Sequence, residues 1–173
     1  MAGPDSGSSG GGSNYQCLPE DPRYGHMATG LYSSLRAVKY WLYQNKYVFG
    51  KDLHTHTAPC SVCETKHRVT QLMIPGQTRC PTSEWAVEYV GLLMSEYEHG
   101  GTDTEDFSGS TDRSAMQYIC VDDNAQSVRG PTDGTSTGAY LRAGCDVDSL
   151  GALSNCPPYR SDKRALSCVV CSK

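Results

Sequence analysis

Short apolar stretches separated by turn-forming residues recur from about residue 30 to the end of the chain. The first lies between Gly30 and Gly50 and is rich in Tyr, Val, Trp and Leu, residue types that favour strands. The 18 Gly and 9 Pro of the sequence favour many turns over long helices. The pattern predicts strands within residues 30–50, 58–64, 68–76, 116–122, 138–144 and 165–172.

The segment 83–100 fits two periodicities. Ser83 could cap a helix whose apolar residues follow at helical spacing. The alternation of apolar residues from Trp85 to Leu93 fits a strand as well. We favour the strand, because Gly91 and two β-branched residues weaken a helix.

These elements predict one mainly β domain built from antiparallel sheets. A length of 173 residues suits a single domain with a sizeable core. Residues 1–13 are rich in Gly and Ser, so we expect a flexible tail there and the cysteine-rich β domain over 14–173. No apolar run reaches the roughly 20 residues that a membrane span requires, and no signal peptide is visible.

Nine cysteines are a high number for a chain of this length. Proteins of reducing compartments seldom keep so many thiols without a metal, so the number predicts a secreted protein stabilised by disulfides. Because nine is odd, one cysteine is left free or links two chains in a covalent homodimer, and Cys17 beside the tail is our candidate. The nine are Cys17, Cys60, Cys63, Cys80, Cys120, Cys145, Cys156, Cys168 and Cys171.

Two CxxC units, at residues 60–63 and 168–171, leave a tetrahedral zinc site open as an alternative. The units are far apart in sequence and their spacers, Ser-Val and Val-Val, suit strands, so we favour disulfides. His54 and His56 are alternate residues and could chelate a metal from one face of a strand. A polar turn is the simpler interpretation of that segment.

The negative charge of the chain is concentrated in one window. Residues 96–124 hold eight acids and one base, a net charge of −7, whereas the whole chain carries −4. This field repels phosphate backbones, so we expect no nucleic-acid binding. It attracts a cation, and calcium prefers oxygen ligands of the kind found here. A solvated acidic loop is the alternative interpretation of the same residues. The predicted calcium ligands are Asp103, Glu105, Asp106, Asp112, Asp122 and Asp123.

No catalytic constellation stands out in the sequence. A G-x-S-x-G motif is absent, no spacing singles out a triad, and no Gly-rich loop joins a strand to a helix. We therefore expect a protein that is not an enzyme.

Six blocks in order resemble a known family: NYQCLPEDPRYG, APCSVC, LMIPGQTRCPTSEWAVEYVGLLMSE, YICVD, CPPY and LSCVVCSK. They resemble the cysteine-rich domain of short-chain, spongin-type collagen-like proteins of marine invertebrates. Within that group, stand-alone domains of this size look like the calcium-dependent, galactose-binding lectins of sea anemones. The segment between Met94 and Tyr118 departs from the collagen-like members, being longer and more acidic, and it coincides with the negative window.

The resemblance implies a secreted, sugar-binding, dimeric protein. A bound calcium ion with two open positions would take vicinal galactose hydroxyls as ligands, and an aromatic ring would stack on the sugar. The candidate sugar contacts are Tyr97, Glu98, His99, Phe107, Tyr118 and Asn124. The alternative is an extracellular structural or assembly module of a collagen-like matrix protein, without sugar binding.

Overall fold

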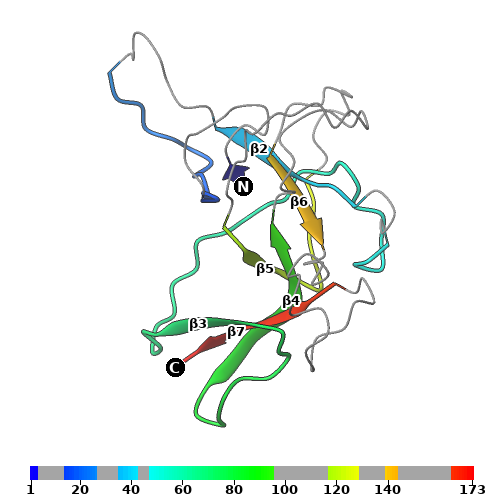
Figure 1. Ribbon diagram of the computed structural model, residues 1–173. Helices are drawn as coiled ribbons and strands as arrows, with labels where there is room; N and C mark the ends of the chain where they lie inside the picture. Colours follow the sequence, from blue (N-terminus) through cyan, green and yellow to red (C-terminus); the bar gives the residue numbers. More distant parts are fainter. Residues whose placement is uncertain (4–13, 27–34, 43–46, 96–116, 129–138, 144–164) are drawn as a thin grey trace, which may run out of the picture. The chain divides into compact units, whose positions relative to one another are not determined.

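The computed structural model describes residues 1–3, 14–26, 35–42, 47–95, 117–128, 139–143 and 165–173 (Figure 1). Every regular element among these residues is a strand. The strands are β1 (Ala2–Gly3), β2 (Arg36–Tyr40), β3 (Gln71–Pro75), β4 (Ala86–Ser95), β5 (Ile119–Asp122), β6 (Ala139–Ala143) and β7 (Ser167–Ser172).

The strands belong to two compact units, and each unit is assembled from segments far apart in the sequence. The first unit holds the described residues up to Val62 together with Gln117, 126–128 and 139–141. The second holds 63–95, 118–125 and the described residues from Arg142 onward. The boundary expected between residues 13 and 14 stays a prediction, since residues 4–13 lie outside the described part of the chain.

β2 is the strand on which the first unit is assembled. β1 pairs with it antiparallel and β6 pairs with it parallel. A third segment joins it without forming a strand: the Ala58 N–H donates to the Val38 carbonyl at 2.8 Å, and the Tyr40 N–H to the His56 carbonyl at 2.9 Å. The buried apolar residues of this unit are Ala2, Val38, Tyr40, Leu42, Phe49, Leu53 and Ala58.

The start of the chain is held in this unit by hydrogen bonds. The Met1 ammonium donates to the Ala58 carbonyl at 3.0 Å, and the Val38 N–H donates to the Met1 carbonyl at 3.1 Å. Ala2 and Gln16 exchange hydrogen bonds of 2.8 Å in both directions. Met1–Gly3 are therefore paired rather than part of a free tail, while the rest of the expected tail lies outside the described residues.

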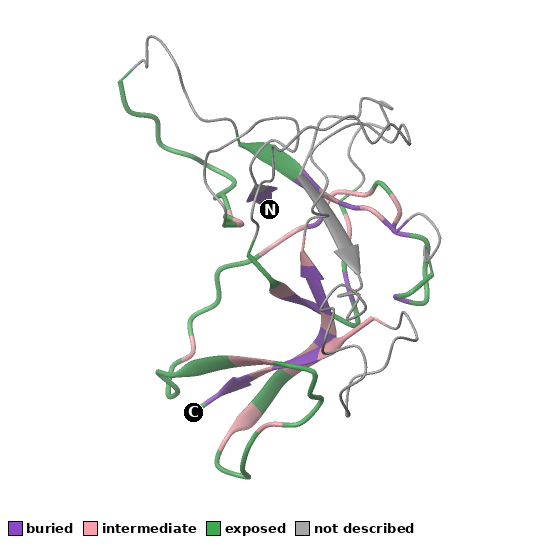
Figure 2. Ribbon diagram, viewed as in Figure 1, coloured by how far each residue is buried: buried purple, intermediate pink, exposed green. Residues whose placement is uncertain are grey.

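The second unit is built on an antiparallel sheet in the order β5–β4–β7–β3. β6 adds a short antiparallel pairing to the end of β4, where Met94 faces Ala143 and Ser95 faces Arg142. β7 lies between β4 and β3 (Figure 1). Most of β7 and the second half of β4 are buried, whereas much of β3 and the start of β4 are exposed (Figure 2).

Alternation of side chains along β7 divides this sheet into two faces. Cys168 and Val170 lie on one face, where Leu93, Cys120 and Cys168 form a buried cluster. Met73, Tyr89, Leu166 and Val170 pack against that cluster. Cys171 lies on the opposite face and is bonded to Cys80. Two disulfides therefore fasten the same strand from its two sides.

Gly91 allows β5 to approach β4 and β7 closely. The Cys120–Cys168 disulfide joins β5 to β7 with a Cα–Cα distance of 5.7 Å, although β4 lies between them in the pairing order. In a flat sheet, strands two positions apart are separated by roughly 9.5 Å. β5 must therefore fold over β4, and a Cβ on Gly91 would lie 1.8 Å from the Val121 carbonyl oxygen.

The predicted fold class, a mainly β antiparallel structure with disulfides, is confirmed. Strands lie inside the predicted segments 30–50, 68–76, 116–122, 138–144 and 165–172, and the ambiguous segment 83–100 contains strand β4. The strand expected over 58–64 is wrong. Beyond Ala58 that segment has no partner for a ladder among the described residues, and Val62 is 86% exposed.

The prediction of at least three internal disulfides is confirmed by Cys17–Cys60, Cys80–Cys171 and Cys120–Cys168. Cys17 as the unpaired cysteine is wrong, because its partner is Cys60. Cys63 is the free and exposed cysteine of the described chain. Cys145 and Cys156 lie outside the described residues.

The zinc alternative for the two CxxC units is wrong as well, because three of its four thiols are used in disulfides. The physical reason is clear in β7. On an extended strand, residues three apart point to opposite faces, so Cys168 and Cys171 cannot turn toward one metal ion.

We predict that Gly91→Ala destabilises the protein by about 1–3 kcal/mol or more, because the new methyl group would overlap the backbone of β5. Urea denaturation followed by tyrosine and tryptophan fluorescence measures the change. Gly25→Ala is the matched control, since nothing lies within 4 Å of its Cβ position. Equal midpoints for the two variants would contradict the close approach.

We also predict the result of alkylating the folded protein without reductant. Cys63 should react, because it is exposed and free, whereas the six cysteines of the three disulfides should react only after reduction. Peptide mapping by mass spectrometry should recover the Cys80–Cys171 and Cys120–Cys168 pairs. Recovery of a Cys168–Cys171 peptide instead would refute the arrangement around β7.

Candidate functional site

The described part of the acidic window, residues 117–124, contains β5 and the turn that follows it. Asp122 is the last residue of β5, and Asp123 and Asn124 form the turn. All three residues are exposed, and the next residue, Ala125, is buried. The turn thus presents two carboxylates and an amide to solvent between two buried anchors, Val121 on one side and Ala125 on the other.

Hydrogen bonds hold this turn in place. The Asn124 N–H donates to Asp122 Oδ1 at 2.8 Å, an Asx turn of the kind these residues favour. The Asp123 N–H donates to the Val90 carbonyl at 3.0 Å, which extends the β4–β5 ladder by one residue. Cys120, two residues before Asp122, is bonded to Cys168. The two carboxylates are therefore attached to the most strongly fastened part of the sheet.

A partly buried tyrosine, Tyr89, contacts the strand that leads into this turn. The Tyr89 hydroxyl donates to the Cys120 carbonyl at 3.1 Å. Burial raises the pKa of Tyr89, and the negative charge of Asp122 raises it further. The phenol therefore stays neutral and keeps its proton for the Cys120 carbonyl. This contact supports the backbone just before the carboxylates.

The remaining predicted residues of this site fall into two groups. Tyr118 is described, 52% exposed, and lies one residue before β5. The others lie outside the described residues; they are Tyr97, Glu98, His99, Asp103, Glu105, Asp106, Phe107 and Asp112. Of the predicted calcium ligands, the structure thus brings together Asp122 and Asp123, and of the predicted sugar contacts it places Tyr118 and Asn124 in the same short segment.

Among the residues that the structure describes, no three His, Cys, Asp or Glu side chains form a group that could hold a metal ion. The two histidines considered as a chelating pair make separate contacts. His54 Nδ1 accepts from the Leu42 N–H at 3.1 Å, and His56 Nδ1 lies 3.1 Å from Ser127 Oγ. These contacts direct the two rings to different partners. They support the simpler interpretation of the segment.

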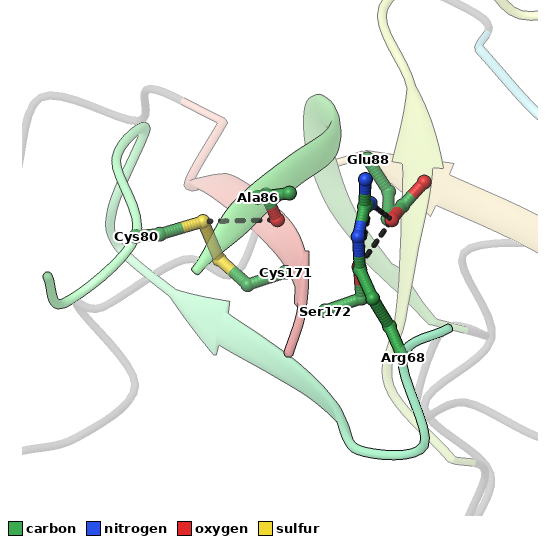
Figure 3. Close-up of a disulfide and its surroundings, with 6 residues drawn as sticks. All are labelled: Arg68, Cys80, Ala86, Glu88, Cys171 and Ser172. Atoms are coloured by element: carbon green, nitrogen blue, oxygen red, sulfur yellow. Dashed lines mark hydrogen bonds and ion pairs between the residues drawn. A yellow bond between two sulfur atoms is a disulfide. The ribbon is translucent and has the colours of Figure 1, made fainter. Parts of the chain in front are cut away.

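A second polar cluster, Arg68, Glu88 and Ser172, was not expected from the sequence (Figure 3). A β-bulge between Val87 and Tyr89 places Glu88 opposite the end of β7, and bulges are known to redirect side chains in this way. The buried Ser172 hydroxyl donates to Glu88 Oε1. Arg68 Nη1 lies 2.7 Å from Glu88 Oε1 and 3.1 Å from Ser172 Oγ.

This cluster and the Cys80–Cys171 disulfide lie on opposite sides of β7. Cys171 points toward Cys80, and the next residue, Ser172, points toward Glu88 and Arg68 (Figure 3). The hydrogen bond from Ser172 is the main cause that lowers the pKa of Glu88, with Arg68 adding to it against the opposing effect of desolvation. The buried hydroxyl is satisfied by both partners, so the cluster fixes the last residues of the sheet.

Sequence reasoning missed this cluster because nothing in the local pattern marks Glu88 as special. One charged residue within an apolar strand is the only sequence signal. The bulge that turns it toward Ser172 depends on pairing with a segment more than 80 residues away.

Comparison with known proteins adds no relative: no family model, no curated protein and no solved structure matches the chain. Among the described residues, no helix is long and apolar enough to cross a membrane. The three disulfides are consistent with an oxidising compartment.

We predict that stability depends on pH through Glu88. Its pKa is lowered from the ordinary value of 4.5, so the ionised form is favoured by folding. The stabilisation is fully present above that value and is lost as the pH falls through the lower pKa of the folded state. Urea denaturation of the wild type and of Glu88→Gln, at a series of pH values from 7 downward, measures the contribution as the difference between the two curves.

Above pH 4.5 the wild type should be more stable than Glu88→Gln, and the difference in their free energies of unfolding should decrease as the pH falls below that value. When both proteins also carry Ser172→Ala, the difference in stability between Glu88 and Glu88→Gln should be smaller at every pH above 4.5. The reason is that the Ser172 hydrogen bond, the main cause of the lowered pKa of Glu88, is then absent. A gap that does not depend on pH would show that Glu88 does not titrate against Ser172 and Arg68.

Proposed function

We propose that the chain is a secreted lectin that binds galactose-type sugars through a protein-bound calcium ion. The observation that carries the proposal is the exposed turn Asp122–Asn124, which is anchored by a disulfide and a strand ladder at the C-terminal end of the −7 window. The order of the sequence blocks, which resembles the sea-anemone lectins, supports the same class.

The rigidity of the turn favours a binding role. Oxygen ligands that are already fixed favour calcium binding, because each ligand ordered on binding adds an entropic cost. Asp122 is a strand residue, and the backbone of Asp123 bonds to β4. These two carboxylates would form the fixed half of the site. Asp103, Glu105, Asp106 and Asp112 would supply the rest from the acidic segment 96–116.

A bound calcium ion would also reduce the repulsion among the carboxylates of this window. Eight acids with one base repel one another within 29 residues, and a divalent cation offsets that repulsion. A calcium ion with open positions then offers them to vicinal sugar hydroxyls. Asn124 would donate a hydrogen bond to a sugar hydroxyl, or accept one from it, at the edge of the site. The exposed ring of Tyr118 would stack on the sugar, as would Tyr97 or Phe107. Glu98 and His99 would contact sugar hydroxyls from the other end of the acidic segment.

A covalent homodimer remains part of the proposal, with Cys63 in place of Cys17 as the described candidate for the interchain bond. Two sites on one dimer would raise the apparent affinity for glycan surfaces through multivalency.

A second candidate function is an extracellular assembly module without sugar binding. The observation that favours it is the apolar exposure in the second unit, where Val69 is 97% exposed and Val87 is 51% exposed. Such side chains suit contact with another protein.

The proposal predicts that calcium stabilises the fold and is required for sugar binding. Stability should rise by about 2.7 kcal/mol at a calcium concentration a hundredfold above the dissociation constant. Calorimetry with calcium, and then with galactose, should show weakened binding for Asp112→Asn, Asp122→Asn and Asp123→Asn. The Asn side chain at 122 keeps an acceptor for the Asn124 N–H, so the change is chiefly one of charge.

Asp21→Asn is the matched control, because Asp21 is an exposed carboxylate outside the acidic window 96–124. It should bind calcium and galactose as the wild type does. If the wild type binds neither ligand, the lectin proposal fails and the assembly module takes its place. If all three site variants bind both ligands normally, the site lies elsewhere.

A further inference from the structure

Among the strands that the structure describes, β3 is the outermost one of the sheet in the second unit. Its hydrogen bonds to β7 show which of its main-chain groups face outward. Thr70 and Lys173 exchange hydrogen bonds of 3.1 and 3.0 Å, and the Gly76 N–H donates to the Ser167 carbonyl at 2.7 Å. In an antiparallel ladder such bonded pairs alternate. Leu72 and Ile74 therefore bond inward to β7, while the main-chain groups of Gln71, Met73 and Pro75 point away from it.

This outward row is self-complementary. Two β3 strands placed antiparallel about a two-fold axis at Met73 would bring the two Met73 residues opposite each other and Gln71 opposite Pro75. The Met73 residues would then exchange N–H to carbonyl bonds in both directions. Each Gln71 N–H would donate to a Pro75 carbonyl. Pro75 lacks an N–H, but in this pair it needs only its carbonyl, which accepts from the Gln71 N–H of the other copy.

Side chains on the face that carries the Cys80–Cys171 disulfide support the same pairing. Leu72, Cys171 and Val87 lie in one row across β3, β7 and β4. Leu72 is 40% exposed and Val87 is 51% exposed. In the two-fold arrangement Leu72 stands opposite Ile74 of the second copy, so the apolar row continues across the interface. Apolar cross-strand pairs of this kind stabilise a sheet.

We infer that the outer edge of β3 is an interface with a second copy of this chain, which pairs through its own β3 about a two-fold axis at Met73. The symmetric contact uses the β3 edge of both copies, so it closes on itself as a dimer. Strand pairing over five residues buries little area, so the dimer is weak and depends on concentration. It is independent of the interchain disulfide and of calcium.

The test uses the full chain with Cys63→Ser, which removes the exposed thiol. Sedimentation should show a monomer–dimer equilibrium. Hydrogen exchange followed by NMR should show protection of the Gln71 and Met73 amides that rises with protein concentration, because these amides face outward in the monomer. The Leu72 and Ile74 amides should be protected at every concentration, because they bond to β7.

Leu72→Lys should raise the dissociation constant about tenfold or more, because it puts a charge into an apolar cross-strand pair. Val87→Lys is the control, since it lies in the same row but two strands from the edge, and it should leave the dissociation constant unchanged. A monomer at all concentrations overturns the inference. Protection of Gln71 and Met73 in the monomer overturns it too, because another part of the same chain would then cover the edge, and so does a dimer in which these amides exchange freely.

Discussion

In an extended strand, successive side chains point to opposite faces of the sheet, and in β7 this alternation decides how the second unit is held together. Cys168 and Cys171 are three residues apart and so fall on opposite faces. One reaches Cys120 of β5 and the other reaches Cys80, which precedes β4. β7 also pairs with β4 on one side and β3 on the other. Four segments are therefore fixed to this one strand.

The absence of a side chain at Gly91 is the second requirement for this arrangement around β7. The Cys120–Cys168 bond requires β5 to fold over β4, and that fold is possible only where β4 has no side chain. The consequence reaches the candidate site directly. The strand that is drawn over Gly91 ends in Asp122, so the disulfide and the glycine together determine where the two described carboxylates stand. A change at either position would move them.

The two polar clusters of this unit differ in the way their charges are satisfied. Glu88 is exposed, but it has the buried Ser172 hydroxyl and the Arg68 guanidinium as partners, so neighbouring groups of the protein compensate its charge. Asp122 uses one oxygen for the Asn124 N–H, and it stands in a window where acids greatly outnumber bases. A compensated carboxylate stabilises a fold, whereas an excess of exposed carboxylates favours a ligand of opposite charge. This contrast is why the calcium proposal rests on the turn after β5 and not on Glu88.

The sequence by itself determined the fold class, the approximate positions of most strands and the concentration of acids in one window, because each depends on local composition and spacing. It could not determine which cysteines pair, because pairing depends on strands brought together from distant parts of the chain. Its position near the N-terminus made Cys17 the candidate for the unpaired cysteine. In the structure the neighbouring residue Gln16 bonds to β1, which pairs with β2, and Cys17 is bonded to Cys60 in the same unit. The bulge at Glu88 and the outward row of β3 were equally hidden, since both are set by the register of β7 against its neighbours. Local pattern specifies elements, and long-range register decides which side chains and backbone groups meet.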